Sequence, residues 1–217
     1  MSMIAPPGRA FFRFAFPCRH REDPPVVDGN LRDWDSSYRV PPLLEVDGGS
    51  SFADLYMAWS DAGLWFAVQV KGKQSFRVDP RNHWQADSFE VWIDTRDVKD
   101  SHRANRYCHH FLFLPGGRGR QGSEPIGRQT SIDRAREQAP PCPEDALQVG
   151  LRRLKRSYQM EVFVPAEGLN GYRPREFDRI GFNYVLNDVD HGSQSWSVDR
   201  SPPFYSDPSR WGTAELR

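Results

Sequence analysis

The chain has little cysteine, no surplus of charge and no long apolar run. Its three cysteines, Cys18, Cys108 and Cys142, are widely spaced and odd in number, which argues against a disulfide framework and favours free thiols. The 29 basic and 29 acidic side chains cancel, so no overall field draws the protein to nucleic acid or to an anionic membrane. We therefore expect neither of these partners.

The beginning of the chain also lacks the apolar stretch of a secretory signal or of a membrane span. Residues 10–16 are interrupted by Arg13 and followed at once by Pro17. The chain as written is therefore expected to be cytoplasmic, and secreted only if a leader is missing. At 217 residues one domain is expected, with 1–25 as an N-terminal extension or first strand and 26–217 as the domain proper.

Helical periodicity is scarce, since no helical pattern exceeds about three turns, whereas aromatic residues make up 13% of the chain. The clearest pattern is in residues 54–70, where two apolar runs flank Ser60-Asp61-Ala62-Gly63 and predict a β-hairpin. Many short strands without long helices predict an all-β, antiparallel β-sandwich of jelly-roll type. The other expected strands are 88–94, 107–114, 146–152, 158–164, 180–186, 195–199 and 212–217.

Residues 116–145 differ from the rest, because they are rich in glycine, proline and arginine and show little periodicity. We interpret them as a long loop insertion with one helical turn near residues 132–138. This insertion is also where a protein partner could bind.

Five stretches of the chain are similar to segments of one known family: residues 27–34 (VDGNLRDW), 59–70, 84–94, 158–188 and 208–216. They resemble, in the same order, the family 9 carbohydrate-binding modules, and they span nearly the whole chain after residue 26. The resemblance implies a β-sandwich that binds a mono- or oligosaccharide between two aromatic rings, usually with structural calcium nearby.

Residues 84–94 resemble the family stretch that holds one clamp tryptophan and, six residues later, a sugar-binding glutamate. The resemblance gives these roles to Trp84 and Glu90. The chemistry is consistent, because the apolar C–H face of a pyranose stacks on an indole while its hydroxyls need polar partners. The alternative is that Trp84 caps the core and Glu90 pairs with an arginine.

The ring opposite Trp84 is expected near the end of the chain, and we favour Trp196. Gln194 lies two residues before it, so an amide is close by, whereas Trp211 stands where the family places a core aromatic. The alternative is that Trp196 is buried packing.

Two further polar residues match the family's pattern. Asn187 resembles the first member of an Asn-Asp pair and either reaches the sugar or forms an Asx turn. Arg96 follows the strand that ends at Asp94, where it is either a basic sugar contact or the partner of a nearby loop carboxylate.

Asp94, Asp97 and Asp100 are spaced by three in an expected loop, and oxygen ligands of this kind are what calcium requires. They are either a structural calcium site or solvated carboxylates. A zinc site is not expected at His109 and His110, because adjacent residues of a strand point to opposite faces.

We find no glycine-flanked serine elbow and no cysteine with an evident base. Glu90 could pair with Asp94 or Glu161 as in a glycosidase, but these residues lie on strands that resemble the binding modules. We therefore expect a non-catalytic domain, which could act beside a glycoside hydrolase.

Two alternatives from other classes remain open. One is a haem-binding or redox-subunit domain, with ligands drawn from Met57, Met160, His109 and His110. The other is a protein interaction module that has lost the sugar site and binds its partner through residues 116–145.

Overall fold

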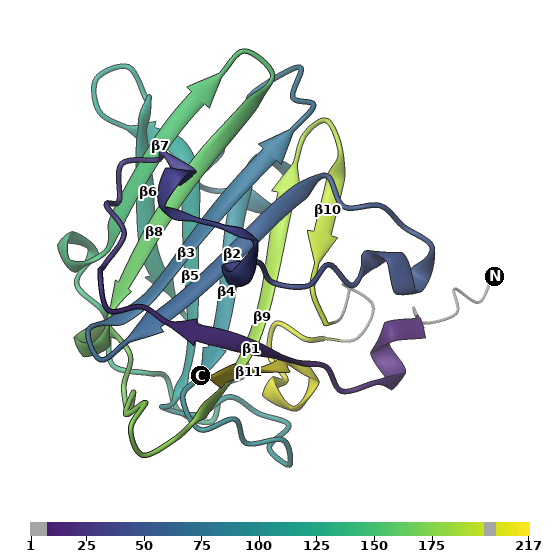
Figure 1. The fold of residues 1–217 in the computed structure, drawn as a ribbon, viewed down its shortest axis with the longest axis vertical. Helices are drawn as coiled ribbons and strands as arrows, with labels where there is room; N and C mark the ends of the chain where they lie inside the picture. Colours follow the sequence, from purple (N-terminus) through teal and green to yellow (C-terminus); the bar gives the residue numbers. More distant parts are fainter. Residues whose placement is uncertain (1–7, 198–202) are drawn as a thin grey trace.

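The computed structural model describes residues 8–197 and 203–217, and within them the chain forms strands joined by loops and single-turn helices (Figure 1). The expected all-β sandwich is confirmed, with eleven strands in the described part. The strands are β1 (Ala15–His20), β2 (Ala53–Ser60), β3 (Gly63–Lys71), β4 (Ser88–Asp94), β5 (Cys108–Arg118), β6 (Glu124–Thr130), β7 (Gln148–Leu154), β8 (Ser157–Pro165), β9 (Arg179–Asp188), β10 (Gly192–Ser195) and β11 (Gly212–Leu216).

The helices of the described ranges are all short 3-10 turns, and none is long and apolar enough to cross a membrane. All but η1, which precedes β1, lie in the connections between strands. They are η1 (Gly8–Phe11), η2 (Leu31–Asp33), η3 (Ser36–Tyr38), η4 (Leu44–Asp47), η5 (His83–Gln85), η6 (Glu144–Ala146), η7 (Ala166–Gly168) and η8 (Pro208–Arg210).

Two layers face each other. Sheet A has the order β6-β5-β4-β9-β11, with β10 on β9, and sheet B has the order β2-β3-β8-β7. β1 joins them: its first four residues pair with β11 and its last two residues pair with β2 (Figure 1). Both of these pairings are parallel, which differs from the purely antiparallel arrangement that we expected.

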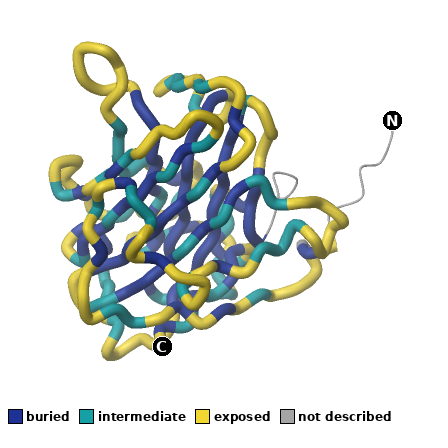
Figure 2. The backbone as a smooth tube through the Cα atoms, turned by 45° about the horizontal axis from the view of Figure 1, so that its top comes forward, coloured by how far each residue is buried: buried dark blue, intermediate teal, exposed yellow. Residues whose placement is uncertain are grey.

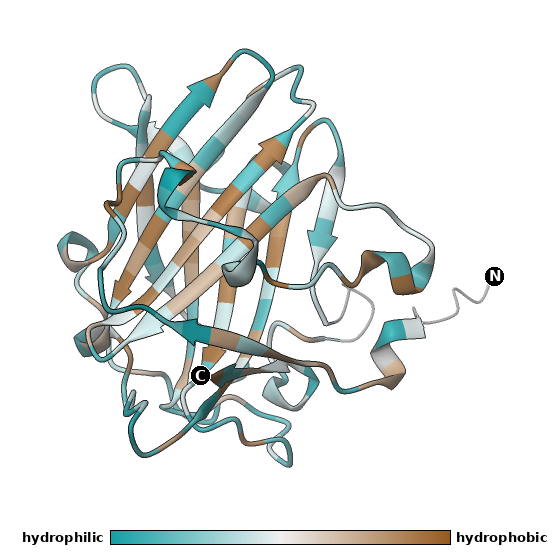
Figure 3. Ribbon diagram, viewed as in Figure 1, coloured by the Kyte–Doolittle hydropathy of each residue, from teal (hydrophilic) through white to brown (hydrophobic). Residues whose placement is uncertain are grey.

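The core fills the space between the sheets, because alternate residues of each strand point inward. On β4 the inward residues Phe89, Val91 and Ile93 are fully buried. Phe66 of β3 stacks on Phe182 of β9 across the layers, with ring centroids 6.1 Å apart and planes 8° apart. The strands at the centre are accordingly buried and carry the apolar bands, whereas exposure is concentrated in the loops (Figures 2 and 3).

The 116–145 segment is more ordered than the sequence indicated. β5 continues to Arg118, and residues 124–130 form β6, which pairs antiparallel with β5. The pattern missed β6 because an edge strand with Pro125 and Gly127 has no apolar alternation. The helical turn predicted over 132–138 was wrong: the Gln138 side chain binds both the N–H and the C=O of Ile132, at 3.0 and 2.7 Å, and holds an irregular loop.

The VDGNLRDW stretch closes the outer face of sheet B. Glu161 of β8 accepts hydrogen bonds from the backbone N–H of Gly29 (2.8 Å) and from Trp34 Nε1 (2.8 Å), with Asp28 and Asn30 at 3.1 Å. Gly29 adopts φ +82°, and a Cβ there would lie 2.6 Å from the backbone of β7. This family-like stretch therefore has a structural role, because it donates hydrogen bonds to a buried carboxylate and so packs against sheet B.

Candidate functional site

Alternate residues of β4 lie on the outer face of sheet A, where they too are buried. Ser88, Glu90 and Trp92 point away from the core, because their strand neighbours point into it. Glu90 is paired in register with Val185 of β9 and Leu112 of β5. Its carboxylate thus lies near the middle of a sheet, where an unpaired charge would be costly.

Three side chains hydrogen-bond to the Glu90 carboxylate. His110 Nε2 lies 2.9 Å and His83 Nε2 3.2 Å from Oε2, and Asn187 Nδ2 donates to Oε1 at 3.0 Å. A carboxylate only accepts, so both imidazoles present a ring N–H to it. Burial raises the pKa of Glu90, but the hydrogen bonds from His110 and His83 outweigh burial and bring that pKa to about 2.

The charged form of Glu90 is therefore held in place at neutral pH. A carboxylate offers about four acceptor positions, and the described hydrogen bonds occupy three of them. One position is left for a donor from a ligand, such as a hydroxyl.

His110 is itself held on two sides. Trp92 stacks on its ring with centroids 4.1 Å and planes 12° apart. His110 Nδ1 is also within hydrogen-bond distance of Thr130 Oγ1 of β6, at 2.6 Å. The donor to Glu90 is thus oriented before any ligand arrives.

The helical turn η5 directs two neighbouring rings differently. His83 points toward Glu90, whereas the Trp84 side chain is exposed, with 46% of its surface accessible. The two rings meet edge to face at 5.2 Å and 81°. Trp84 is thus a large indole at the surface that contacts the imidazole bound to the buried Glu90 carboxylate, although tryptophan is normally well buried.

A buried lysine anchors the loop that carries η5. Lys73 Nζ lies 2.8 Å from Asp87 at the start of β4 and 2.8 Å from Asp188 at the end of β9. Asp87 also accepts the backbone N–H of Arg77 at 3.0 Å. The lysine thereby ties the loop between β3 and β4 to both strands that build the site.

Two of the sequence-predicted ligand residues belong to the core instead. Trp196 is 1% exposed and packs edge-on against Phe16, with its Nε1 donating to the Pro41 carbonyl at 2.9 Å. Gln194 is buried, and its side-chain amide accepts a hydrogen bond from the Ala53 N–H and donates one to the Ala53 carbonyl. The prediction that Trp196 faces Trp84 was wrong, because β10 turns residues 194 and 196 toward the space between the sheets.

Trp211, the other candidate ring, is also buried, which agrees with its expected place as a core aromatic. It belongs to a small apolar cluster on the outer side of sheet A that includes Trp92, Val185 and Phe204.

Arg96 lies at the opposite end of β4 from Trp84, and a seven-residue strand separates them by about 20 Å. Its guanidinium lies 4.0 Å from the centroid of the Phe177 ring and 4.6 Å from that of Tyr107, and it donates to the Gly171 carbonyl. Arg96 therefore holds loops together there, and the structure does not bring it to Glu90.

The three predicted calcium ligands are placed differently from one another. Asp94 is buried and accepts the N–H groups of Arg96 and Val98, while Asp97 is paired with Lys99 at 2.5 Å. Asp100 is exposed. Among the described residues no group of three or more His, Cys, Asp or Glu side chains could hold a metal ion. The calcium site stays a prediction from the family resemblance.

His109 and His110 point to opposite faces, as the strand alternation indicates. His109 is fully buried and stacks beside Phe111 of the core, whereas His110 lies on the outer face against Trp92. Met57 and Met160, the other candidate haem ligands, are also in the core.

Burial makes His109 a source of acid sensitivity. Desolvation lowers the pKa of His109 from 6.5 to about 4, so between these values the unfolded chain binds the extra proton and the folded protein does not. Stability should fall by about 3 kcal/mol as the pH falls from 7 to 4. Urea unfolding at three pH values in this window should show the loss in the wild type and a smaller one in His109→Leu.

The matched control for His109 is His102→Leu, because the His102 side chain is exposed. This variant should keep the full acid-induced loss of stability. An equal loss in wild type and His109→Leu would contradict the assignment.

Comparison with known proteins agrees with this arrangement of strands. The model of the family described as carbohydrate family 9 binding domain-like matches residues 45–217. The chain belongs to this family. The resemblance found in the sequence is thereby confirmed. None of the curated proteins matches the sequence.

Two solved structures share the fold of this family 9 domain. Both are a family 9 carbohydrate-binding module from Caldicellulosiruptor kristjanssonii, one in complex with cellotriose and one with glucose. Each has a TM-score of 0.65 and 14% sequence identity to this chain, of which 94% is covered. The covered shares of the two modules are 94% and 96%.

Sequence reasoning missed two of the residues that surround Glu90. His83 directly precedes Trp84, and His110 was considered only as a metal ligand. The sequence did contain a signal for His110. The strand alternation that argues against a shared zinc site at His109 and His110 also puts these two side chains on opposite faces, so one of them lies on the outer face of the strand next to β4. No pattern pairs His83 with Glu90, since η5 decides its direction.

Proposed function

We propose that this family 9 domain binds a mono- or oligosaccharide on the outer face of sheet A without reacting with it. The apolar face of one sugar ring stacks on Trp84, and a hydroxyl of the same sugar donates to Glu90. The observation that carries the proposal is an exposed indole in contact with His83, whose ring is hydrogen-bonded to the buried Glu90 carboxylate, and the described residues leave one acceptor position of that carboxylate unused.

The family and its solved members support the choice of ligand, because the structural neighbours were solved with glucose and cellotriose. Trp196, the residue expected to oppose Trp84, is buried, and so is the other candidate, Trp211. We therefore assign the stacking to the single indole of Trp84. The polar side chains of Glu90, His110 and Asn187 fix the orientation of the sugar.

A glycosidase pair is not supported by the placement of the carboxylates. A general acid must hold a proton near neutral pH, whereas Glu90 has a pKa of about 2. Glu161 lies on the other sheet, capped by backbone N–H groups, and Asp94 lies at the far end of β4. We propose a binding role alone for this chain.

Replacing Glu90 with glutamine tests the proposal. Glu90→Gln keeps the shape but removes the charge that a sugar hydroxyl would meet, and hydrogen bonds to charged groups contribute about 2 kcal/mol. Calorimetry with glucose, cellobiose and cellotriose should show affinity reduced about 30-fold.

The matched control is Glu176→Gln, an exposed glutamate paired with the nearby Arg173, which should bind as the wild type does. No heat from the wild type with any of these sugars, or unchanged affinity in Glu90→Gln, would refute the proposed function.

A further inference from the structure

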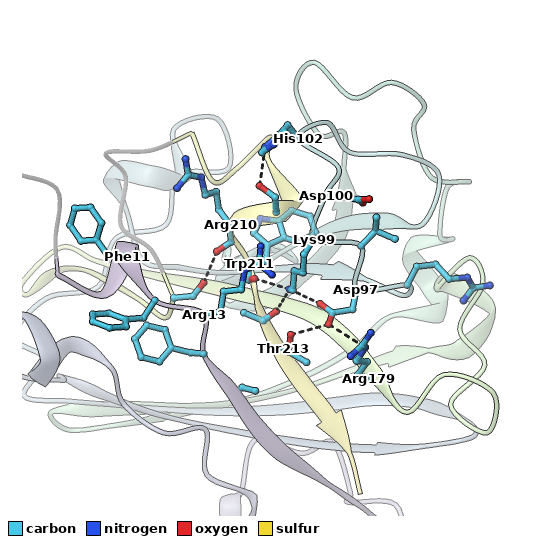
Figure 4. A pocket seen from close by; sticks show the side chains of 18 residues that line it. Phe11, Arg13, Asp97, Lys99, Asp100, His102, Arg179, Arg210, Trp211 and Thr213 are labelled. Atoms are coloured by element: carbon cyan, nitrogen blue, oxygen red, sulfur yellow. Dashed lines mark hydrogen bonds and ion pairs between the residues drawn. The ribbon is translucent and has the colours of Figure 1, made fainter.

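A wide cleft opens at the other end of the domain, away from Trp84. Its volume is about 1100 Å³. One wall is the segment that leads into β1, with Phe11, Phe12 and Arg13; the other walls are the loop after β4, the beginning of β9, and the junction of η8 with β11 (Figure 4).

The cleft concentrates positive charge in a chain whose net charge is zero. Two aspartates, Asp97 and Asp100, line it together with five basic side chains, which leaves a surplus of three positive charges. The basic side chains are Arg13, Arg96, Lys99, Arg179 and Arg210.

The charges at the floor of the cleft already satisfy one another. Lys99 Nζ binds Asp97 at 2.5 Å and the carbonyls of Trp211 and Gly212 at 2.8 and 2.9 Å. Thr213 Oγ1 donates to Asp97 at 2.9 Å. The floor is therefore rigid and has little attraction for a free cation.

The arginines at the rim are the groups that a ligand could meet. Arg13 is exposed and, among the described residues, has no hydrogen-bond or ion-pair partner. Arg179 is exposed and only loosely paired with Asp97, at 3.7 Å, and Arg210 is 3.8 Å from Asp207. Guanidinium groups of this kind bind carboxylates and sulfates in bidentate fashion.

Aromatic rings stand beside these arginines. Phe11 and Phe12 have 73% and 64% of their surfaces exposed and belong to the same wall as Arg13. A ligand that uses both features has apolar faces and acidic groups in alternation. The cleft is also larger than the roughly 300–1,000 Å³ that holds a drug-sized ligand, so it has room for a chain of several rings.

We propose that this cleft is a second binding site, for an oligosaccharide whose sugars carry carboxylate groups. Sugar faces contact Phe11 and Phe12, and the carboxylates pair with Arg13 and Arg179. The site is independent of Trp84, since the length of β4 separates the two.

The experiment is a titration of the full chain with a galacturonic acid trimer, with cellotriose and with inorganic phosphate. The trimer should bind, its affinity should fall as salt is added, and the Arg13→Ala, Arg179→Ala double variant should bind it about tenfold more weakly. The double variant Arg118→Ala, Arg134→Ala removes the same charge from exposed positions elsewhere and should bind the trimer normally.

These experiments test the two proposed sites independently of each other. Trp84→Ala should leave trimer binding unchanged, and the Arg13 and Arg179 variant should leave cellotriose binding unchanged. No binding of the trimer, equal weakening in both double variants, or phosphate binding as tightly as the trimer would each overturn the second site as a site for acidic oligosaccharides.

Discussion

Trp84→Ala should weaken the binding of glucose or cellotriose about 30-fold. The indole is an exposed flat surface in contact with His83, the partner of Glu90, and stacking a sugar on it removes about 80 Å² of apolar surface from water, worth about 2 kcal/mol. Trp84→Phe keeps a smaller flat face and should lose less. Calorimetry and the change in tryptophan fluorescence on adding sugar are the measurements.

The control for Trp84 is Phe177→Ala, which removes an exposed aromatic ring at the far end of β4, beside Arg96. Sugar affinity should not change in this variant. If Trp84→Ala bound sugar as tightly as the wild type, the contact surface would lie elsewhere on the domain.

Lys73→Met should strongly reduce the stability of the domain. Lys73 is fully buried between Asp87 and Asp188, with Asp190 at 3.5 Å. Removing the cation leaves uncompensated carboxylates in the interior, and breaking a buried pair in this way costs about 3–5 kcal/mol. Urea unfolding at pH 7 would measure the loss.

Lys71→Met provides a close comparison, because Lys71 lies two residues away and pairs with Asp54 at the surface. An exposed pair contributes about 0–1 kcal/mol, so this variant should unfold nearly as the wild type does. Equal stability of the two methionine variants would contradict the role given to Lys73.

The Lys73 variant also connects stability with the proposed function. Asp87 joins Lys73 to the backbone of Arg77, in the loop that leads to Trp84. Where Lys73→Met still folds, its affinity for sugar should decrease, because the indole is then held less firmly. A site built on a loop depends on such anchoring.

The strands could be predicted because their apolar residues alternate with a period of two. The hairpin of β2 and β3 and the core face of β4 follow from this alternation. β6 could not be predicted, because this edge strand is only partly buried on either face and its sequence does not alternate between apolar and polar residues. The parallel pairings of β1 were also hidden, since pairing partners far apart in sequence leave no local pattern.

The candidate site was only partly predictable. Trp84, Glu90 and Asn187 were identified by their place in the family-like stretches, and the structure brings Glu90 and Asn187 into contact. Trp196 was misassigned, because the local sequence around an aromatic residue near a strand end does not indicate whether its side chain faces the core or the solvent. The direction depends on strand register, which β10 acquires only by pairing with β9.

The sequence by itself determined the fold class, the family and the strand that carries Glu90, because short-range alternation and motif order are properties of the chain alone. The tertiary structure decided which side chains surround that carboxylate, which tryptophan is exposed, and where the arginines gather. Those outcomes depend on strands and turns that are distant in sequence, and their contacts are set by register and packing between the two sheets.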